Sequence, residues 1–273
     1  MKRIHAISWY IITMITTSII GYPLLWLIYS PFKTNKDIFK NPWSLPTYLN
    51  FSSFKEVLST GNFMNSYINS LIITTISVTL ILLFSSMAAY VFSKYEFRGK
   101  EIIFITFLGG LMIPQQSVLL PLYILFRKLG LLDTLTSTIL VYIAFGLPIS
   151  IFILKYFFDE IPRELEDAAK VDGCSPLKIY WSIIVPMSTP ALLTVGIYNA
   201  VVIWNDFIFA LIFLSSPEKR TISLGIWSFS NIQGINISAT LAALNIATFP
   251  LLIIYFIFQR KIISGMMAGA LKG

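Results

Sequence analysis

Six apolar runs, each close to the length of one bilayer crossing, constrain the fold of this chain more than any other feature. A transmembrane helix needs roughly 20 consecutive, mostly apolar residues. A transmembrane β-barrel would instead show alternating segments of about ten residues. We therefore predict an all-α integral membrane protein, a single transmembrane domain over residues 1–273. The six expected spans cover residues 7–29, 67–92, 101–126, 135–157, 182–214 and 241–258. Pro186 and Pro190 interrupt the fifth near its start.

Charged residues are sparse and scattered. Only 12% of the 273 residues are charged, 56% are hydrophobic and the mean hydropathy is +0.77, whereas about 25% of a soluble domain is charged. The net charge of +7 comes from Lys and Arg that form no basic stripe, which argues against nucleic acid as a partner. A lone Cys174 and a lone His5 exclude a disulfide framework and a Cys or His metal site. We expect no metal and no catalytic residues.

The distribution of Lys and Arg sets the orientation. With the N-terminus inside, twelve of these residues face the inside and eight the outside, and the inside of a membrane protein is usually the more basic side. We expect both termini in the cytoplasm of a bacterial cell, with a multi-pass chain in the cytoplasmic membrane. The first run is longer than a signal-peptide core, so an uncleaved helix is favoured. The roles of the outer segments 30–66 and 215–240 stay open.

A charged segment, residues 159–181, separates the fourth and fifth runs. Within it, Pro162 suits the first position of a helix, and acidic residues in the first turns favour the positive end of the helix dipole. Gly173 suits the position just past the helix end. Ser175 then reads as the N-cap of a second short helix, with Pro176 at its first position. The sequence predicts a short, well-delimited helix over 162–173 on the cytoplasmic side.

This helix presents small and acidic side chains. Spacing predicts one face with Leu165, Ala168, Ala169 and Asp172. A second face carries Glu164, Asp167 and Lys170. Residues 159–181 contain six acids and three bases. A helix lying on anionic lipid would favour a basic face, so the acidic excess favours a protein partner over a lipid surface.

Several segments together resemble the ABC importer permeases, and specifically the carbohydrate-importer subunits of the maltose-transporter type. The run 166–173, followed by Pro186, looks like the "EAA" loop of that family, with Asp167 where a glutamate is expected. An aspartate in place of the glutamate keeps the negative charge, but its side chain is shorter. The likeness extends over nearly the whole chain. Further matching segments are 69–71, 112–114, 204–207 and 265–273.

The resemblance implies a six-transmembrane-helix importer bundle with a cytoplasmic coupling helix. It implies that this helix docks on a cytoplasmic ATPase, which binds the ATP and Mg²⁺ that this chain does not. It also implies a second permease subunit in a heterodimer, two ATPase subunits, an extracytoplasmic solute-binding protein, contact with membrane lipid, and a carbohydrate substrate. The expected ATPase-docking residues are Glu164, Asp167, Ala168, Ala169, Asp172 and Gly173.

Polar side chains inside the runs are candidates for the translocation path, because polar groups in a membrane usually face the bundle or a cavity. Helix–helix hydrogen bonding is the alternative for all of them. After Pro114, Gln115 and Gln116 could mend a kink or line the pore, and we favour the kink. Gly265, Gly269 and Gly273 read as a flexible tail. The residues of the expected path are Asn199, Trp204, Asn205 and Asp206.

Other functions remain open on the sequence. A secondary transporter would show internal repeats, and none is visible. A membrane enzyme lacks support, since the chain contains no GxSxG, HExxH or GxxxxGK[ST]. An ABC importer permease for a solute other than a sugar also fits. A channel would predict passive flux without ATPase subunits.

Overall fold

The structure is a computed structural model that describes residues 2–232 and 236–270, and within these residues it contains helices and no strand. Helices satisfy every backbone hydrogen bond internally, as the membrane interior requires. Four described helices are long and apolar enough to cross a membrane, and the number rises to six if each of two bent pairs forms one span. The chain forms two compact units, residues 1–64 with 225–249 and residues 65–224 with 250–273.

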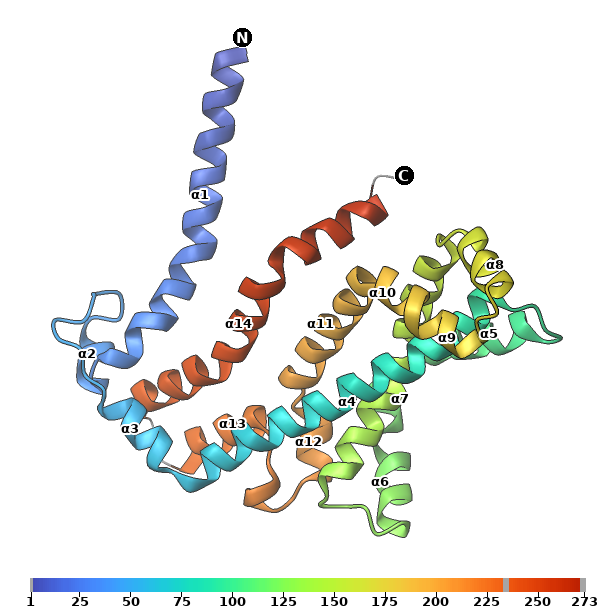
Figure 1. Ribbon diagram of the computed structural model, residues 1–273. Helices are drawn as coiled ribbons and strands as arrows, with labels where there is room; N and C mark the ends of the chain where they lie inside the picture. Colours follow the sequence, from blue (N-terminus) through green and yellow to red (C-terminus); the bar gives the residue numbers. More distant parts are fainter. Residues whose placement is uncertain (1, 233–235, 271–273) are drawn as a thin grey trace. The chain divides into compact units, whose positions relative to one another are not determined.

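The first unit begins with α1, an apolar helix that no proline interrupts before Pro23 (Figure 1). Its apolar window within Trp9–Phe32 has no buried residue, as expected for a helix that faces lipid. Beyond it, Lys33 is buried and donates to the carbonyl oxygens of Asn41, at 2.6 Å, and Ser44, at 3.0 Å. The helices here are α1 (Lys2–Tyr29), η1 (Ser30–Phe32), α2 (Asn35–Lys40) and α3 (Ser52–Ser59).

Two expected spans form long unbroken helices. The second is α4 (Gly61–Lys94), whose sequence holds no proline to remove a backbone hydrogen bond. The fourth is α7 (Leu135–Asp159), which continues through Pro148 and begins at a Thr134 N-cap. Both helices start or end a few residues beyond the predicted limits, because apolar run length locates a span better than its ends.

The third expected span is broken rather than continuous. The two halves, α5–η2 and η3–α6, meet at 93°. Pro114 has no N–H to continue the helix, and Ser117 satisfies its carbonyl oxygen through both its backbone N–H, at 3.0 Å, and its hydroxyl, at 2.7 Å. The predicted kink is confirmed, but Ser117 rather than the glutamines makes these bonds. The pieces are α5 (Lys100–Gly109), η2 (Gly110–Met112), η3 (Gln115–Val118) and α6 (Leu119–Lys128).

The fifth expected span, residues 182–214, is also not one helix. A 76° bend at Ser188 follows Pro186 and precedes Pro190, so the break falls where the prolines predicted it. A second break at Asp206 was not predicted. The pieces are α9 (Pro176–Ile179), a π-helical turn (Tyr180–Ile184), α10 (Val185–Met187), α11 (Thr189–Asn205) and α12 (Ile208–Phe213).

The last part of the chain is more helical than predicted. The outer segment 215–240 contains η5 (Pro217–Lys219) and α13 (Ile222–Ile232), and α14 (Ile237–Ala270) includes the sixth span. The expected flexible tail is wrong for Gly265 and Gly269, because the backbone stays helical to Ala270. Gly273 lies outside the described residues.

Candidate functional site

The charged segment folds as predicted from its local signals. Helix α8 (Arg163–Val171) begins one residue later than expected, with Pro162 as its N-cap. At its other end the N–H of Gly173 donates to Lys170 and the N–H of Cys174 donates to Ala169, at 3.0 and 2.9 Å. This is a Schellman motif. Gly173 has a φ of +76°, which explains the glycine and confirms its predicted place.

The second short helix of the segment is fixed in the same local way. The side chain of Ser175 accepts a hydrogen bond from the N–H of Lys178, and Pro176 occupies the first helical position. Both predictions for these residues are confirmed. Together α8, α9 and the π-helical turn form a compact element at one end of the second unit (Figure 1).

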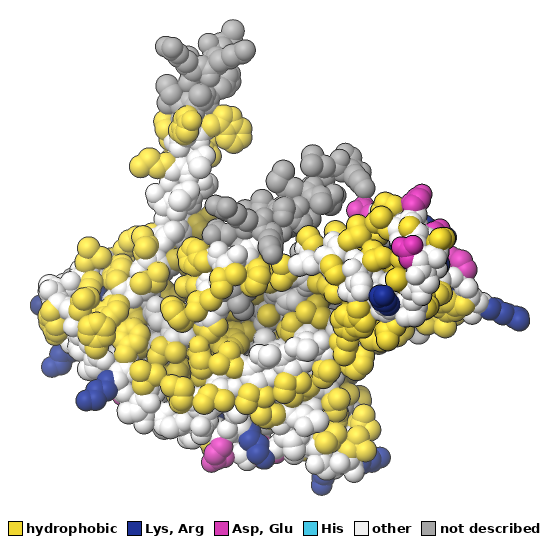
Figure 2. Space-filling view, viewed as in Figure 1, with side chains coloured by type: hydrophobic (Ala, Val, Ile, Leu, Met, Phe, Trp, Pro, Cys, Tyr) yellow, Lys and Arg dark blue, Asp and Glu magenta, His cyan; other side chains and the backbone are white. Residues whose placement is uncertain are grey.

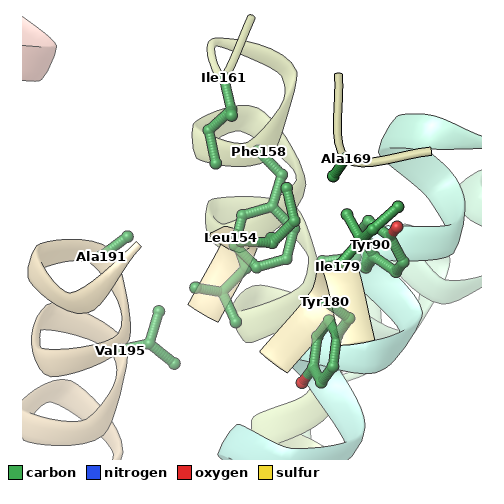
Figure 3. Packing of buried hydrophobic residues seen from close by; sticks show 11 residues of the cluster. Tyr90, Leu154, Phe158, Ile161, Ala169, Ile179, Tyr180, Ala191 and Val195 are labelled. Carbon is green, nitrogen blue, oxygen red and sulfur yellow. The ribbon is translucent and has the colours of Figure 1, made fainter. Parts of the chain in front are cut away.

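One expected docking residue lies on the buried face of α8. Ala169 is buried in a cluster with Tyr90 of α4, Phe158 of α7 and Ile179 of α9 (Figure 3). Its neighbour on that face is the acid Glu166. Ala169 packs inside this chain and is therefore withdrawn from the expected ATPase-docking residues.

The other expected docking residues lie on the exposed side of the segment. Leu165 and Ala168, which spacing placed on the same face as Ala169, are exposed, and Val171 is 88% exposed. Figure 2 shows acidic side chains gathered in the region where α8 lies. Their docking role stays a prediction. The remaining exposed candidates are Glu164, Asp167, Ala168, Asp172 and Gly173.

One exposed ion pair lies on this side of α8. Lys170 Nζ donates to Asp167 Oδ1 at 2.8 Å. This hydrogen bond, with the attraction between the two charges, lowers the pKa of Asp167 and raises the pKa of Lys170. Asp167 is therefore ionised at neutral pH, so the departure from the expected glutamate keeps a negative charge at this position.

Buried contacts that the sequence did not reveal attach α8 to span α4. Lys94 Nζ lies 3.2 Å from Glu166 Oε1, and the geometry makes this an ion pair rather than an aligned hydrogen bond. The hydroxyl group of Tyr90 donates to Glu166 Oε2 at 3.4 Å. Both charged side chains are about as buried as core residues, at 4% and 5% exposure. Removing one partner of such a pair costs about 3–5 kcal/mol. The basic residue in the last turn of α4 was the available signal.

The expected path residues divide into two groups. Asn199 and Asp206 line one small cavity of about 70 Å³, together with Gln115, Tyr142 and Tyr198. Trp204 and Asn205 are not part of its lining. Trp204 is buried and packs edge-on against Tyr67 at 5.8 Å, whereas exposed Asn205 donates to the carbonyl oxygen of Val201.

Within the cavity wall, Asn199 and Asp206 each bind neighbouring elements. Asn199 on α11 donates to Ser150 of α7 at 3.0 Å, which is the helix–helix bond considered as the alternative. Asp206 accepts from Tyr142 at 2.8 Å and from the N–H of Ala210 in α12 at 3.3 Å. Asp206 thus links the broken fifth span to α7.

A second carboxylate, that of Asp133 in the loop before α7, binds the segment 215–219 that follows α12. Asp133 accepts from the N–H groups of Ser215 and Ser216 at 3.0 and 2.9 Å, from the Ser216 hydroxyl, and from Lys219 at 3.1 Å. Burial alone would raise the pKa of Asp133, but the hydrogen bonds from Ser216, Lys219 and Ser215 outweigh it and hold the pKa well below its ordinary value. No sequence pattern indicated this cluster.

Comparison with known proteins agrees with this architecture. Residues 81–267 match the family model described as "Binding-protein-dependent transport system inner membrane component". The chain is 45% identical over 268 residues to the ORF2 product of Caldicellulosiruptor sp. (strain Rt8B.4), named as an ABC transporter permease, covering 97% of each chain. It is 36% identical over 256 residues to the trehalose/maltose transport system permease protein MalG of Thermococcus litoralis, covering 92% and 91%.

Among solved structures, a chain of a bacterial ABC transporter involved in alginate import has the same fold. The TM-score is 0.82 with 23% identity, over 94% of this chain and 96% of that one. The match to the family model covers more than half of the chain, and the two relatives above are similar over almost their full lengths. The chain therefore belongs to the family of inner membrane components of binding-protein-dependent transport systems.

Proposed function

We propose that this chain is one of two permease subunits of an ATP-driven importer for a sugar or oligosaccharide. Relatives at 30–36% identity are named for transport of trehalose and maltose, diacetylchitobiose, or arabinooligosaccharides, which supports the substrate class. The single observation that carries the mechanism is α8, an exposed acidic helix anchored through buried contacts to a membrane span.

The exposed side of α8 would dock an ATPase subunit, and Glu164, Asp167, Ala168, Asp172 and Gly173 would make the contact. Small side chains permit close approach, and the carboxylates supply charge for a basic groove. ATP and Mg²⁺ would bind the two ATPase subunits. A second permease and a solute-binding protein would complete the complex. The excess of Lys and Arg on the predicted inner side supports cytoplasmic termini in a bacterial cell membrane, with α8 on the same side.

The cavity bounded by Asn199 and Asp206 would lie along the sugar path. It holds about 70 Å³, which is enough for water molecules or for hydroxyl groups of a passing sugar. Tyr142, Gln115 and the two expected path residues give it donors and acceptors that suit hydroxyl groups. Trp204 and Asn205 would act outside this cavity.

Docking can be tested by crosslinking in the assembled complex. In a Cys174→Ser background, Ala168→Cys is expected to crosslink to the ATPase, because Ala168 is exposed. Ala169→Cys is the matched control one residue away, and its burial predicts little crosslinking. Absence of a crosslink from Ala168 in a complex that hydrolyses ATP would overturn the docking assignment.

Transport can be tested with the same complex in proteoliposomes supplied with its solute-binding protein. Uptake of a labelled oligosaccharide is expected to require ATP and to survive a protonophore. Uptake that a protonophore abolishes and that ATP depletion leaves intact would indicate a secondary transporter. ATP-dependent uptake of amino acids in place of sugars would replace the proposed substrate class.

A further inference from the structure

One stripe of helix α4 contacts the coupling segment, residues 159–181, at three successive turns. Ser86, Tyr90 and Lys94 are four residues apart, so they lie on the same side of the helix. The hydroxyl groups of Ser86 and Tyr180 are 2.7 Å apart, and the rings of Tyr90 and Tyr180 have centroids 5.4 Å apart. The stripe ends at Lys94, beside Glu166.

Lys94 joins three pieces of the chain at once. It closes α4, forms the ion pair with Glu166 of α8 at 3.2 Å, and donates to the carbonyl oxygen of Ile161, in the link from α7 to α8, at 2.7 Å. The contact is therefore tertiary, because the paired residues are far apart in sequence. A single side chain fixes the start of α8 and its buried face.

The burial of this pair sets it apart from the other ion pairs among the described residues. Lys155–Asp159 joins residues of one helix with exposures of 21% and 40%, and Lys170–Asp167 does so with 59% and 66%. Solvent screens such exposed pairs, so they contribute little to the stability of the fold. The Lys94–Glu166 pair is shielded from solvent at 4% and 5% exposure, so it constrains the geometry of the two helices it joins.

We propose that Lys94 and Glu166 are positioning residues that make the coupling segment and the last turns of α4 move as one body. This inference rests on the proposed function. A displacement that an ATPase imposes on α8 then reaches span α4 directly. Chains of packed and hydrogen-bonded side chains can carry such coupling between sites. The Ser86–Tyr90–Lys94 stripe supplies one from the segment into the membrane.

The first test measures coupling in the assembled complex. Glu166→Gln keeps the shape of the side chain and removes its charge, and Asp159→Asn is the matched control because it breaks an exposed pair at the end of α7. Glu166→Gln is expected to lower the sugar transported per ATP hydrolysed several-fold, while ATPase co-purification is retained. Asp159→Asn is expected to leave that ratio unchanged. A role in folding alone would lower the amount of complex without changing the ratio, and that result overturns the proposal.

The second test does not depend on sugar transport. Cys174 is half-buried, packs beside the cluster around Ala169 and is the only cysteine of the chain. Its maleimide labelling in the assembled complex therefore reports whether the segment stays on the bundle. Glu166→Gln is expected to speed labelling several-fold, and Asp159→Asn is not. Unchanged labelling overturns the role of the Lys94–Glu166 pair, even where the wild-type complex transports sugar. Accelerated labelling in a complex that transports no sugar leaves that role intact and instead rejects the proposed import of sugar.

Exchange of the two charges provides the rescue. The double variant Lys94→Glu with Glu166→Lys is expected to recover most of the transport per ATP and the slow labelling of Cys174, because it restores an ion pair across the same contact. Each single exchange places two like charges together and is expected to be worse than Glu166→Gln. A double variant no better than the single ones contradicts the assignment.

Discussion

The hydroxyl group of Tyr142 lies 2.8 Å from Oδ2 of Asp206, which joins helix α7 to the point where the fifth span breaks. The same carboxylate accepts from the N–H of Ala210 and so begins helix α12. A break inside a membrane frees backbone groups that must find partners. Asp206 is one such partner, because it accepts the hydrogen bond of the Ala210 N–H. It has this structural role in addition to any contact with substrate.

Replacement of both residues should reveal a direct energetic coupling. Tyr142→Phe and Asp206→Ala, singly and together, are expected to give a coupling energy of about 0.5–3 kcal/mol in the free energy of unfolding, because the two residues share one hydrogen bond. Thermal unfolding in detergent provides the measurement. Tyr156→Phe is a suitable control, since Tyr156 is an exposed tyrosine on the same helix. Additive effects of Tyr142→Phe and Asp206→Ala would show that the hydrogen bond does not stabilise the fold.

Gly146 allows α7 to approach α11 closely. A Cβ atom at this position would lie 2.5 Å from Ile81 Cδ1 and 2.6 Å from Asn199 Oδ1. Gly146→Ala is therefore expected to destabilise the protein by about 1–3 kcal/mol through overpacking, measured as a lower unfolding temperature. Gly109→Ala is the control, because nothing lies within 4 Å of a Cβ atom there. Equal stability of the two variants would mean that the packing around Gly146 yields easily.

The spans could be predicted from sequence because the hydrophobic signal is long and local. The kink near Pro114 and the bend near Pro186 followed from a missing backbone N–H. The break at Asp206 could not be predicted, because it depends on Tyr142, more than sixty residues earlier in the chain. The helical continuation past Gly265 was missed since spaced glycines lower helix propensity without forbidding a helix.

The candidate site shows the same division between local and tertiary information. Gly173 and Ser175 were placed correctly, because caps depend on neighbouring residues alone. Glu166 was counted only as one of the six acids of the segment, and Ala169 was assigned to a docking surface. Spacing defines which residues share a face of α8, but only the contact with Lys94 of α4 determines which face is buried.

Gly173 should tolerate only residues that accept a left-handed backbone. An L side chain at a φ of +76° costs about 1–2 kcal/mol, and asparagine bears this conformation better than alanine. Gly173→Ala is expected to lower the unfolding temperature and to reduce the co-purifying ATPase, and Gly173→Asn should lie between it and the wild type. Unfolding scans and subunit ratios after purification measure both effects. If alanine and asparagine matched the wild type, the Schellman motif would not govern the end of α8.

Asp133 should stabilise the second unit in a pH-dependent way, through its contacts with the segment 215–219. Its carboxylate holds the N–H groups of Ser215 and Ser216 and the ammonium group of Lys219. Because its pKa is lower in the folded chain than its ordinary value of 3.8, its contribution is complete above that pH and is lost as the pH falls through the folded-state value. Asp133→Asn is thus expected to destabilise the protein at neutral pH by about 1.5–3 kcal/mol.

The pH dependence separates this role from a loss of packing. The difference in unfolding temperature between the wild type and Asp133→Asn should stay constant from a pH of about 7 to about 4 and narrow from about 4 to about 3. In the lower range the unfolded wild-type chain binds a proton that the folded carboxylate still excludes. Asp159→Asn, at an exposed ion pair, is the control and should change stability little at either pH. A difference that stayed constant over this range would assign the effect to the shape of the side chain rather than to its charge.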